Sequence, residues 1–129
     1  SLDAYVDTPW REQAQWWGDA RVQGWNTFFL SGDDRLFRRG IHFIASQIAP
    51  SGLTYGHAPT TAHACILPDF SIIWLITLWD YFWQTGKTEA FETHHHLIYY
   101  DLDFQYFQLN MQLISLLYES LFLQKVHPK

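Results

Sequence analysis

Apolar residues recur at helical spacing along most of the chain, and turn residues separate the periodic stretches. Thr8 can cap a helix and Pro9 is preset for its first position, so we expect a first helix over residues 9–30. A second helical period, over residues 36–48, follows the turn at Ser31-Gly32. The first half of the chain therefore predicts a helical hairpin.

The second half of the chain begins with a segment that lacks any helical period. Residues 50–68 carry three prolines and two glycines, which predicts a long loop, and long loops in small domains are often functional. Residues 71–85 are apolar on nearly all sides, which predicts a buried helix. Two more helices are expected over residues 89–100 and 107–125. The pattern as a whole predicts an all-α fold of stacked antiparallel helical hairpins.

Composition narrows the classes of protein to consider. A chain of 129 residues with 48% apolar and 16% charged residues predicts one globular domain, 1–129. The net charge is −5, and the only basic stripe is Arg35, Arg38 and Arg39, which argues against binding of nucleic acid. The longest apolar run, 72–79, is too short to span a membrane. No signal peptide is recognised in the sequence, and its cellular location stays open.

Candidate chemistry gathers in one short segment that combines acidic and aromatic residues. On a helix that starts near Pro9, one face would carry Glu12, Trp16, Asp19 and Gln23, with Asp7 at its N-terminal end. The chain is 19% aromatic and has seven tryptophans, a composition that suits either large helical cores or clefts that stack sugars. This face therefore reads as a ligand site, and the alternative is a capping Asp7, solvated charges and core tryptophans.

The spacing Asp-x-Pro-x-Arg-Glu-x-x-x-Trp-x-Gly-Asp resembles the catalytic signature of the bacterial α-L-rhamnosidases. These are inverting glycoside hydrolases whose catalytic domain is a barrel of six helical hairpins. The matching residues are Asp7, Pro9, Arg11, Glu12, Trp16, Gly18 and Asp19. The resemblance implies Glu12 as the general acid, Asp7 and Asp19 as ligands of the sugar hydroxyls, and Arg11 and Trp16 in the same pocket.

Two further residues are candidates for contact with the sugar. The resemblance continues weakly to Asp69, since an acidic residue in a barrel loop often contacts the sugar. His57 lies in the long loop, where contact with a sugar is also expected. We expect the loop to close over the site. No metal or cofactor is expected, because the three consecutive histidines 94–96 would point about 100° apart on a helix.

The resemblance leaves the second catalytic carboxylate unassigned. Twelve helices do not fit in 129 residues, so the chain corresponds to part of an α/α barrel, and no glutamate sits where the family has its general base. The expected function is hydrolysis of terminal α-L-rhamnosides by a catalytic-domain fragment. The alternative is a non-catalytic helical module that binds a saccharide or a protein. A partial barrel would expose apolar surface, so we expect self-association or packing against the missing part of the barrel.

Overall fold

Four α-helices and no strand make up the regular structure of the part of the chain that is described. The computed structural model describes residues 3–61 and 65–103, of which 99–103 are described by their backbone only. The helices are α1 (Trp17–Ser31), α2 (Arg35–Ser46), α3 (Pro68–Thr85) and α4 (Glu89–Asp103). The prediction of an all-helical chain is confirmed, and the helix expected over 107–125 lies outside the described residues.

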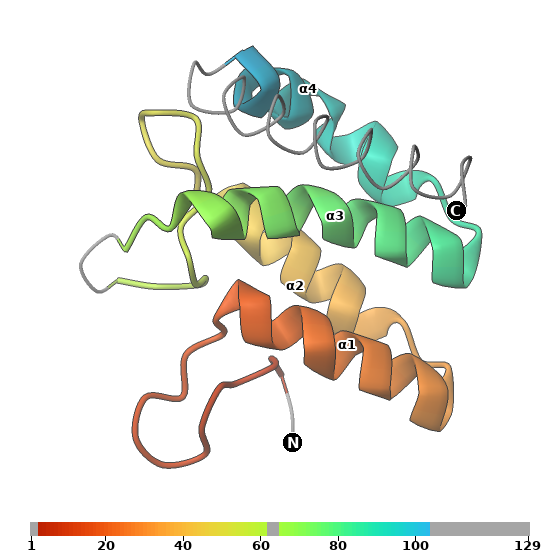
Figure 1. The fold of residues 1–129 in the computed structure, drawn as a ribbon. Helices are drawn as coiled ribbons and strands as arrows, with labels where there is room; N and C mark the ends of the chain where they lie inside the picture. The colour runs from red at the N-terminus through yellow and green to blue at the C-terminus, as the bar shows by residue number, and fades with distance from the viewer. Residues whose placement is uncertain (1–2, 62–64, 104–129) are drawn as a thin grey trace, which may run out of the picture.

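The helices form two antiparallel hairpins joined by a long loop (Figure 1). Helices α1, α3 and α4 lie side by side in that order, and α2 lies behind them and contacts all three. Gly32 and Gly86 end the first helix of each hairpin in the left-handed conformation, with φ of 67° and 70°. Glycine adopts this conformation without a steric penalty, and so the chain can reverse within a few residues.

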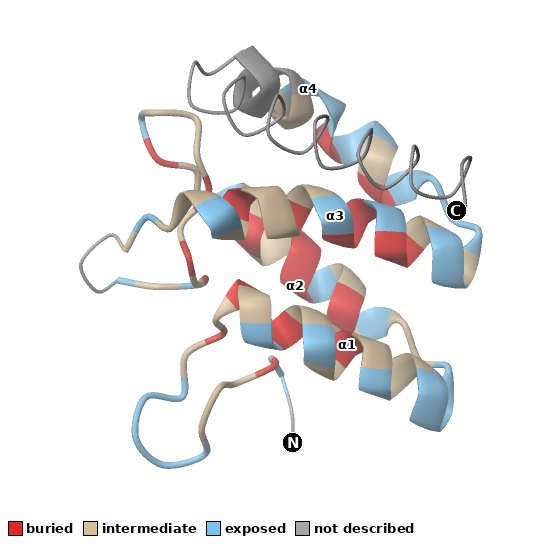
Figure 2. Ribbon diagram, viewed as in Figure 1, coloured by how far each residue is buried: buried red, intermediate tan, exposed pale blue. Residues whose placement is uncertain are grey.

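Large aromatic rings fill the core where α1, α2 and α3 meet. The buried positions lie where these helices face one another (Figure 2). Trp17 stacks on Phe37 with ring centroids 5.9 Å apart, and its Nε1–H donates to Thr77 Oγ1 at 3.1 Å. Trp74 is fully buried as well, and its Nε1–H donates to the carbonyl oxygen of Ile41 at 3.2 Å. Each buried indole thus has a hydrogen-bond acceptor, which removes the cost of burying its polar N–H.

One side of α3 is exposed, contrary to the prediction of a helix buried all round. Ile76, Trp79 and Trp83 are 39%, 54% and 69% exposed. The physical reason is geometric: among the described helices, α1, α2 and α4 contact α3, and together they cover only part of its circumference.

The two long loops meet at one end of the molecule, beside the beginnings of α1 and α3 (Figure 1). The prediction of a loop over 50–68 is confirmed, except that its last residue, Pro68, already belongs to α3. Trp16 and His57 pair as an antiparallel β-bridge, and the N–H of Trp17 donates to the carbonyl oxygen of Gly56 at 2.9 Å. The loop before α1 and the loop before α3 therefore form one joined surface.

Candidate functional site

The loop that carries Glu12 is closed by its own backbone. The N–H of Asp7 donates to the carbonyl oxygen of Ala14 at 3.0 Å, and the Asp7 Oδ1 accepts from the N–H of Ala14 at 3.1 Å. Inside this ring the Thr8 hydroxyl accepts from the N–H of Glu12, four residues on, at 3.3 Å. A helix cap accepts from the N–H two or three residues on, so this contact belongs to a turn that does not continue as a helix.

The prediction that the first helix starts near Pro9 is wrong, because α1 begins at Trp17. Gln13 has a φ of 53°, in the left-handed region, and this conformation ends the turn. Glu12, Trp16 and Asp19 therefore do not share one helical face, since only Asp19 lies in the helix. Closure of the loop by Asp7 and Ala14 takes the place of the expected helical hydrogen bonds.

The Glu12 carboxyl nevertheless lies among the side chains that the motif picked out. Arg11 forms an ion pair with its Oε1 at 2.9 Å, and the Trp16 Nε1–H donates to its Oε2 at 3.0 Å. The Asp7 carboxyl lies close enough to Glu12 for the Glu12 carboxyl to lower its pKa. Four of the predicted site residues thus meet at one point, although Glu12 itself is exposed.

The electrostatics of the acidic pair are asymmetric. Desolvation alone would raise the pKa of Asp7, but the N–H groups of Thr8 and Ala14 and the Glu12 carboxyl together hold the pKa of Asp7 below its usual value. Asp7 is therefore held in its charged form.

Aromatic contacts attach this loop to the segment before α3. The rings of Trp16 and His57 meet edge to face with centroids 4.5 Å apart, and Trp16 also contacts Phe70 at 6.1 Å. A Cβ on Gly18 would lie 2.8 Å from the Phe70 ring, so only glycine fits there. His57 is therefore brought to the Glu12 site through Trp16.

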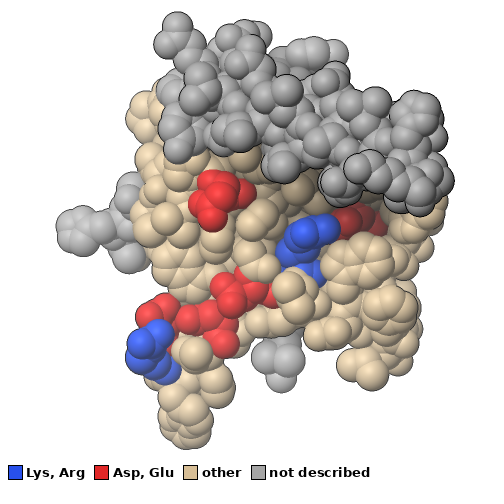
Figure 3. Space-filling model, in the orientation of Figure 1, with Lys and Arg blue, Asp and Glu red and all other residues tan. Residues whose placement is uncertain are grey.

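Asp19 and Asp69 lie in the first turns of α1 and α3 and are both exposed. Within the described part of the chain neither makes a hydrogen bond or an ion pair, and the start of a helix favours their negative charge. Acidic side chains gather on the face of the molecule that holds the Glu12 loop (Figure 3). This leaves the two carboxylates free for hydroxyl groups of a ligand.

A second polar cluster, between α1 and α3, was not predicted from the sequence. The buried Asp80 carboxylate accepts from Arg21 Nε at 2.6 Å and from Trp25 Nε1 at 3.1 Å. The signal that could have found it is Asp80 itself, a charged residue in the middle of an otherwise apolar helix. Arg21 and Trp25 lie on α1 and both bind Asp80 on α3, so the three side chains form a bridge between these two helices.

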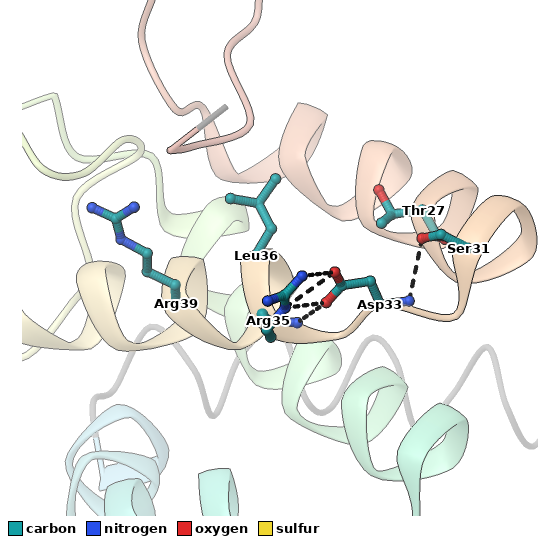
Figure 4. Close-up of a pocket in the computed structure, with 6 residues that line it drawn as sticks. All are labelled: Thr27, Ser31, Asp33, Arg35, Leu36 and Arg39. Atoms are coloured by element: carbon teal, nitrogen blue, oxygen red, sulfur yellow. Dashed lines mark hydrogen bonds and ion pairs between the residues drawn. The ribbon is translucent and has the colours of Figure 1, made fainter. Parts of the chain in front are cut away.

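A pocket of about 360 Å³ lies between α1 and α2, away from the Glu12 loop (Figure 4). Arg35 is held at its edge by Asp33, with Nη2 and Oδ2 2.5 Å apart, and the Arg35 side chain and N–H hold the pKa of Asp33 at about 2. The lining residues are Thr27, Ser31, Asp33, Arg35, Leu36 and Arg39. No residue predicted for the sugar site is among them.

Comparisons with known proteins do not extend this description. No family model, no curated protein and no solved structure matches the chain. Among the described residues, no group of three or more metal-binding side chains comes together. None of the described helices has both the length and the hydropathy needed to cross a lipid bilayer.

Proposed function

We propose that this chain carries the acid side of the site of an inverting glycoside hydrolase for terminal α-L-rhamnosides, with Glu12 as the general acid. The observation that carries the proposal is the convergence of Asp7, Arg11 and Trp16 on the Glu12 carboxyl. The spacing of the same residues resembles the α-L-rhamnosidase signature. The two hairpins would then be two of the six in an α/α barrel.

Inverting hydrolysis requires one protonated carboxyl and one carboxylate on opposite sides of the glycosidic bond. In the proposed role Glu12 would donate its proton to the leaving oxygen. Asp7 and Asp19 accept hydrogen bonds from the sugar hydroxyls. His57 contacts Trp16 from the neighbouring loop, and Asp69 in the first turn of α3 is the further carboxylate proposed to reach the sugar.

The general base has to come from outside the described residues. An inverting enzyme keeps its two carboxyls roughly 6.5–9.5 Å apart to leave room for a water molecule, but Asp7 lies close enough to Glu12 for the Glu12 carboxyl to lower its pKa. Glu89 and Glu92 lie on α4 and bind Arg38 and Thr88 there. The chain by itself is therefore expected to show little or no hydrolysis.

The missing base also favours a second candidate function, which is saccharide binding without hydrolysis. The same carboxylates and the Trp16 ring would hold a sugar in either case. Hydrolysis and binding can be distinguished in the longest natural form of the protein, because only a hydrolase would have a second carboxylate on the opposite side of the glycosidic bond from Glu12.

Sugar binding can be tested by titrating the isotope-labelled chain with L-rhamnose and with methyl α-L-rhamnoside, observed by NMR. We expect the Trp16 indole N–H signal to move, because that group contacts Glu12. Trp10 is 91% exposed in the same loop and serves as the internal control, with an unchanged signal. The proposal would be contradicted if the Trp16 signal moved equally with D-glucose, or if it moved with none of the sugars.

Substitutions then assign the roles. Glu12→Gln should keep sugar affinity, whereas Asp7→Asn and Asp19→Asn should weaken it, and Asp3→Asn is the matched control with an exposed carboxyl. In the complete protein Glu12→Gln should reduce hydrolysis of a rhamnoside with a poor leaving group by about 10²- to 10⁴-fold. Efficient hydrolysis by the 129-residue chain, with inversion, would contradict our placement of the base and direct attention to Glu89 and Glu92.

A further inference from the structure

A pair of histidines joins the two hairpins at the contact between α2 and α4. His42 Nδ1 and His94 Nε2 lie 2.8 Å apart, which is a hydrogen bond, and His94 is only 8% exposed. The edge of the Trp74 ring packs against His94 with centroids 5.8 Å apart. The pair therefore lies where α2, α3 and α4 meet.

This hydrogen bond depends on the number of protons that the two rings carry. A neutral imidazole has one donor nitrogen and one acceptor nitrogen, so two neutral rings can be joined by one hydrogen bond. If both rings are protonated, both facing nitrogens are donors, and two positive charges are in contact. The second proton therefore breaks the contact instead of strengthening it.

Several charged or titratable groups surround the pair. On α2, an open groove is lined by His42 together with Arg35, Arg38 and Arg39, and each of these arginines is paired with a carboxylate. On α4, His96 repels a charged His94. Glu89 forms an ion pair with Arg38. The His95 ring contacts the carbonyl oxygen of Glu92. The side chain of α3 that packs on the pair, Trp74, is uncharged.

Burial, followed by the charges of His42 and His96, lowers the pKa of His94 to about 4. A metal ion is a poor alternative occupant, because no third ligand completes a site among the described residues. Proton uptake is the chemistry that this contact can perform.

We propose that the His42–His94 contact is a pH-sensitive switch, which holds α4 on α2 and α3 near neutral pH and releases α4 in acid. Release uncovers the apolar side of α4, where Ala90, Phe91, Leu97 and Ile98 pack against the core. The switch is independent of the sugar site, which none of these residues contacts.

The direction of the effect follows from linkage between protonation and docking. A histidine on a released helix has its ordinary pKa near 6.5, whereas the docked His94 has a pKa of about 4. Between these values the released state binds more protons, so docking is complete above about pH 6.5 and weakens as the pH falls toward 4. At pH 5 the equilibrium constant for release should be greater by up to about 30-fold than at neutral pH.

Hydrogen exchange of backbone amides measures the release directly. After correction for the intrinsic chemical rate, amides of α4 should exchange up to about 30-fold faster relative to amides of α1 at pH 5 than at pH 7.5. A ratio that is independent of pH would overturn the proposal.

The variant that tests the cause is the double substitution His42→Asn, His94→Gln. The two amides keep a donor and an acceptor near the original nitrogens but take up no proton, so the pH dependence should disappear. His95→Gln, at an exposed position on the same helix, is the matched control and should behave as the original chain. A pH response that persists in the double variant would overturn the proposal. If that variant does not fold, NMR titration of the original chain decides: His94 titrating near pH 4 supports the switch, and titration near 6.5 overturns it.

Discussion

At the scale of single residues, Trp16 has two roles that one substitution can separate. Its Nε1–H donates to Glu12 at 3.0 Å, and its ring packs on His57 and Phe70. Trp16→Phe keeps the aromatic packing and removes the donor. We expect an unchanged circular dichroism spectrum and a loss of rhamnose affinity of about 1 kcal/mol, roughly fivefold, measured by NMR titration.

The control for this prediction is Trp10→Phe, which removes an exposed indole from the same loop without removing a contact to Glu12. It should leave affinity unchanged. Equal effects of the two substitutions would show that the Trp16–Glu12 hydrogen bond does not orient the acid.

The residue types of this site could be predicted from the sequence, but their geometry could not. Asp7, Arg11, Glu12 and Trp16 come together as the motif implied, yet the predicted helical face does not exist. A Thr-Pro start signal describes only local preference. The choice between helix and closed loop depends on whether the Asp7 carboxylate or a helical carbonyl satisfies the N–H of Ala14, and local propensity does not decide that.

At the scale of helices, Asp80 connects α1 and α3 through Arg21 and Trp25. Asp80→Asn should reduce the free energy of unfolding by about 1–3 kcal/mol, since it weakens hydrogen bonds to a buried, charged acceptor. Arg21→Met should cost at least as much, because it leaves the buried Asp80 carboxylate charged and without its ion-pair partner. Chemical denaturation of both variants is the measurement.

The double variant, Arg21→Met with Asp80→Asn, completes a double-mutant cycle. A coupling of about 0.5–3 kcal/mol is expected for residues in direct contact. Additive losses would mean that Asp80 stabilises the fold through Trp25 alone.

Several helix ends followed from the sequence, although the starts of α1 and α3 did not. The end of α3 at Gly86 and the loop after α2 were predicted because glycine and proline restrict the backbone directly. Burial around α3 was not predicted correctly. A uniformly apolar helix does not indicate which of its sides a neighbour will cover, and Trp79 and Trp83 remain outside.

At the scale of the whole molecule, these exposed rings are the expected site of association. Trp79 and Trp83 stack on each other with centroids 6.1 Å apart. Large exposed apolar patches are unusual on monomers, so we expect the chain to associate as its concentration rises. Trp79→Ser with Trp83→Ser should reduce this association in sedimentation experiments.

Trp10→Ser is the matched control, because Trp10 is 91% exposed but lies in a loop apart from α3. It should leave the association constant unchanged. Association that survives the double substitution would assign the contact to another surface, such as the exposed end of α1 at Phe29 and Leu30.

The hydrogen bond from the N–H of Trp17 to the carbonyl oxygen of Gly56 has a consequence for the order of folding. The first turn of α1 lacks a side-chain cap and takes its partner from a loop that follows α2 in the chain. Contacts between distant residues close slowly, because the intervening chain must first be ordered. The Glu12 loop should therefore mature only after the loop that follows α2 has been ordered. On the ribosome, a nascent chain that has not yet exposed Gly56 would hold α1 and α2 without this contact to the Glu12 loop.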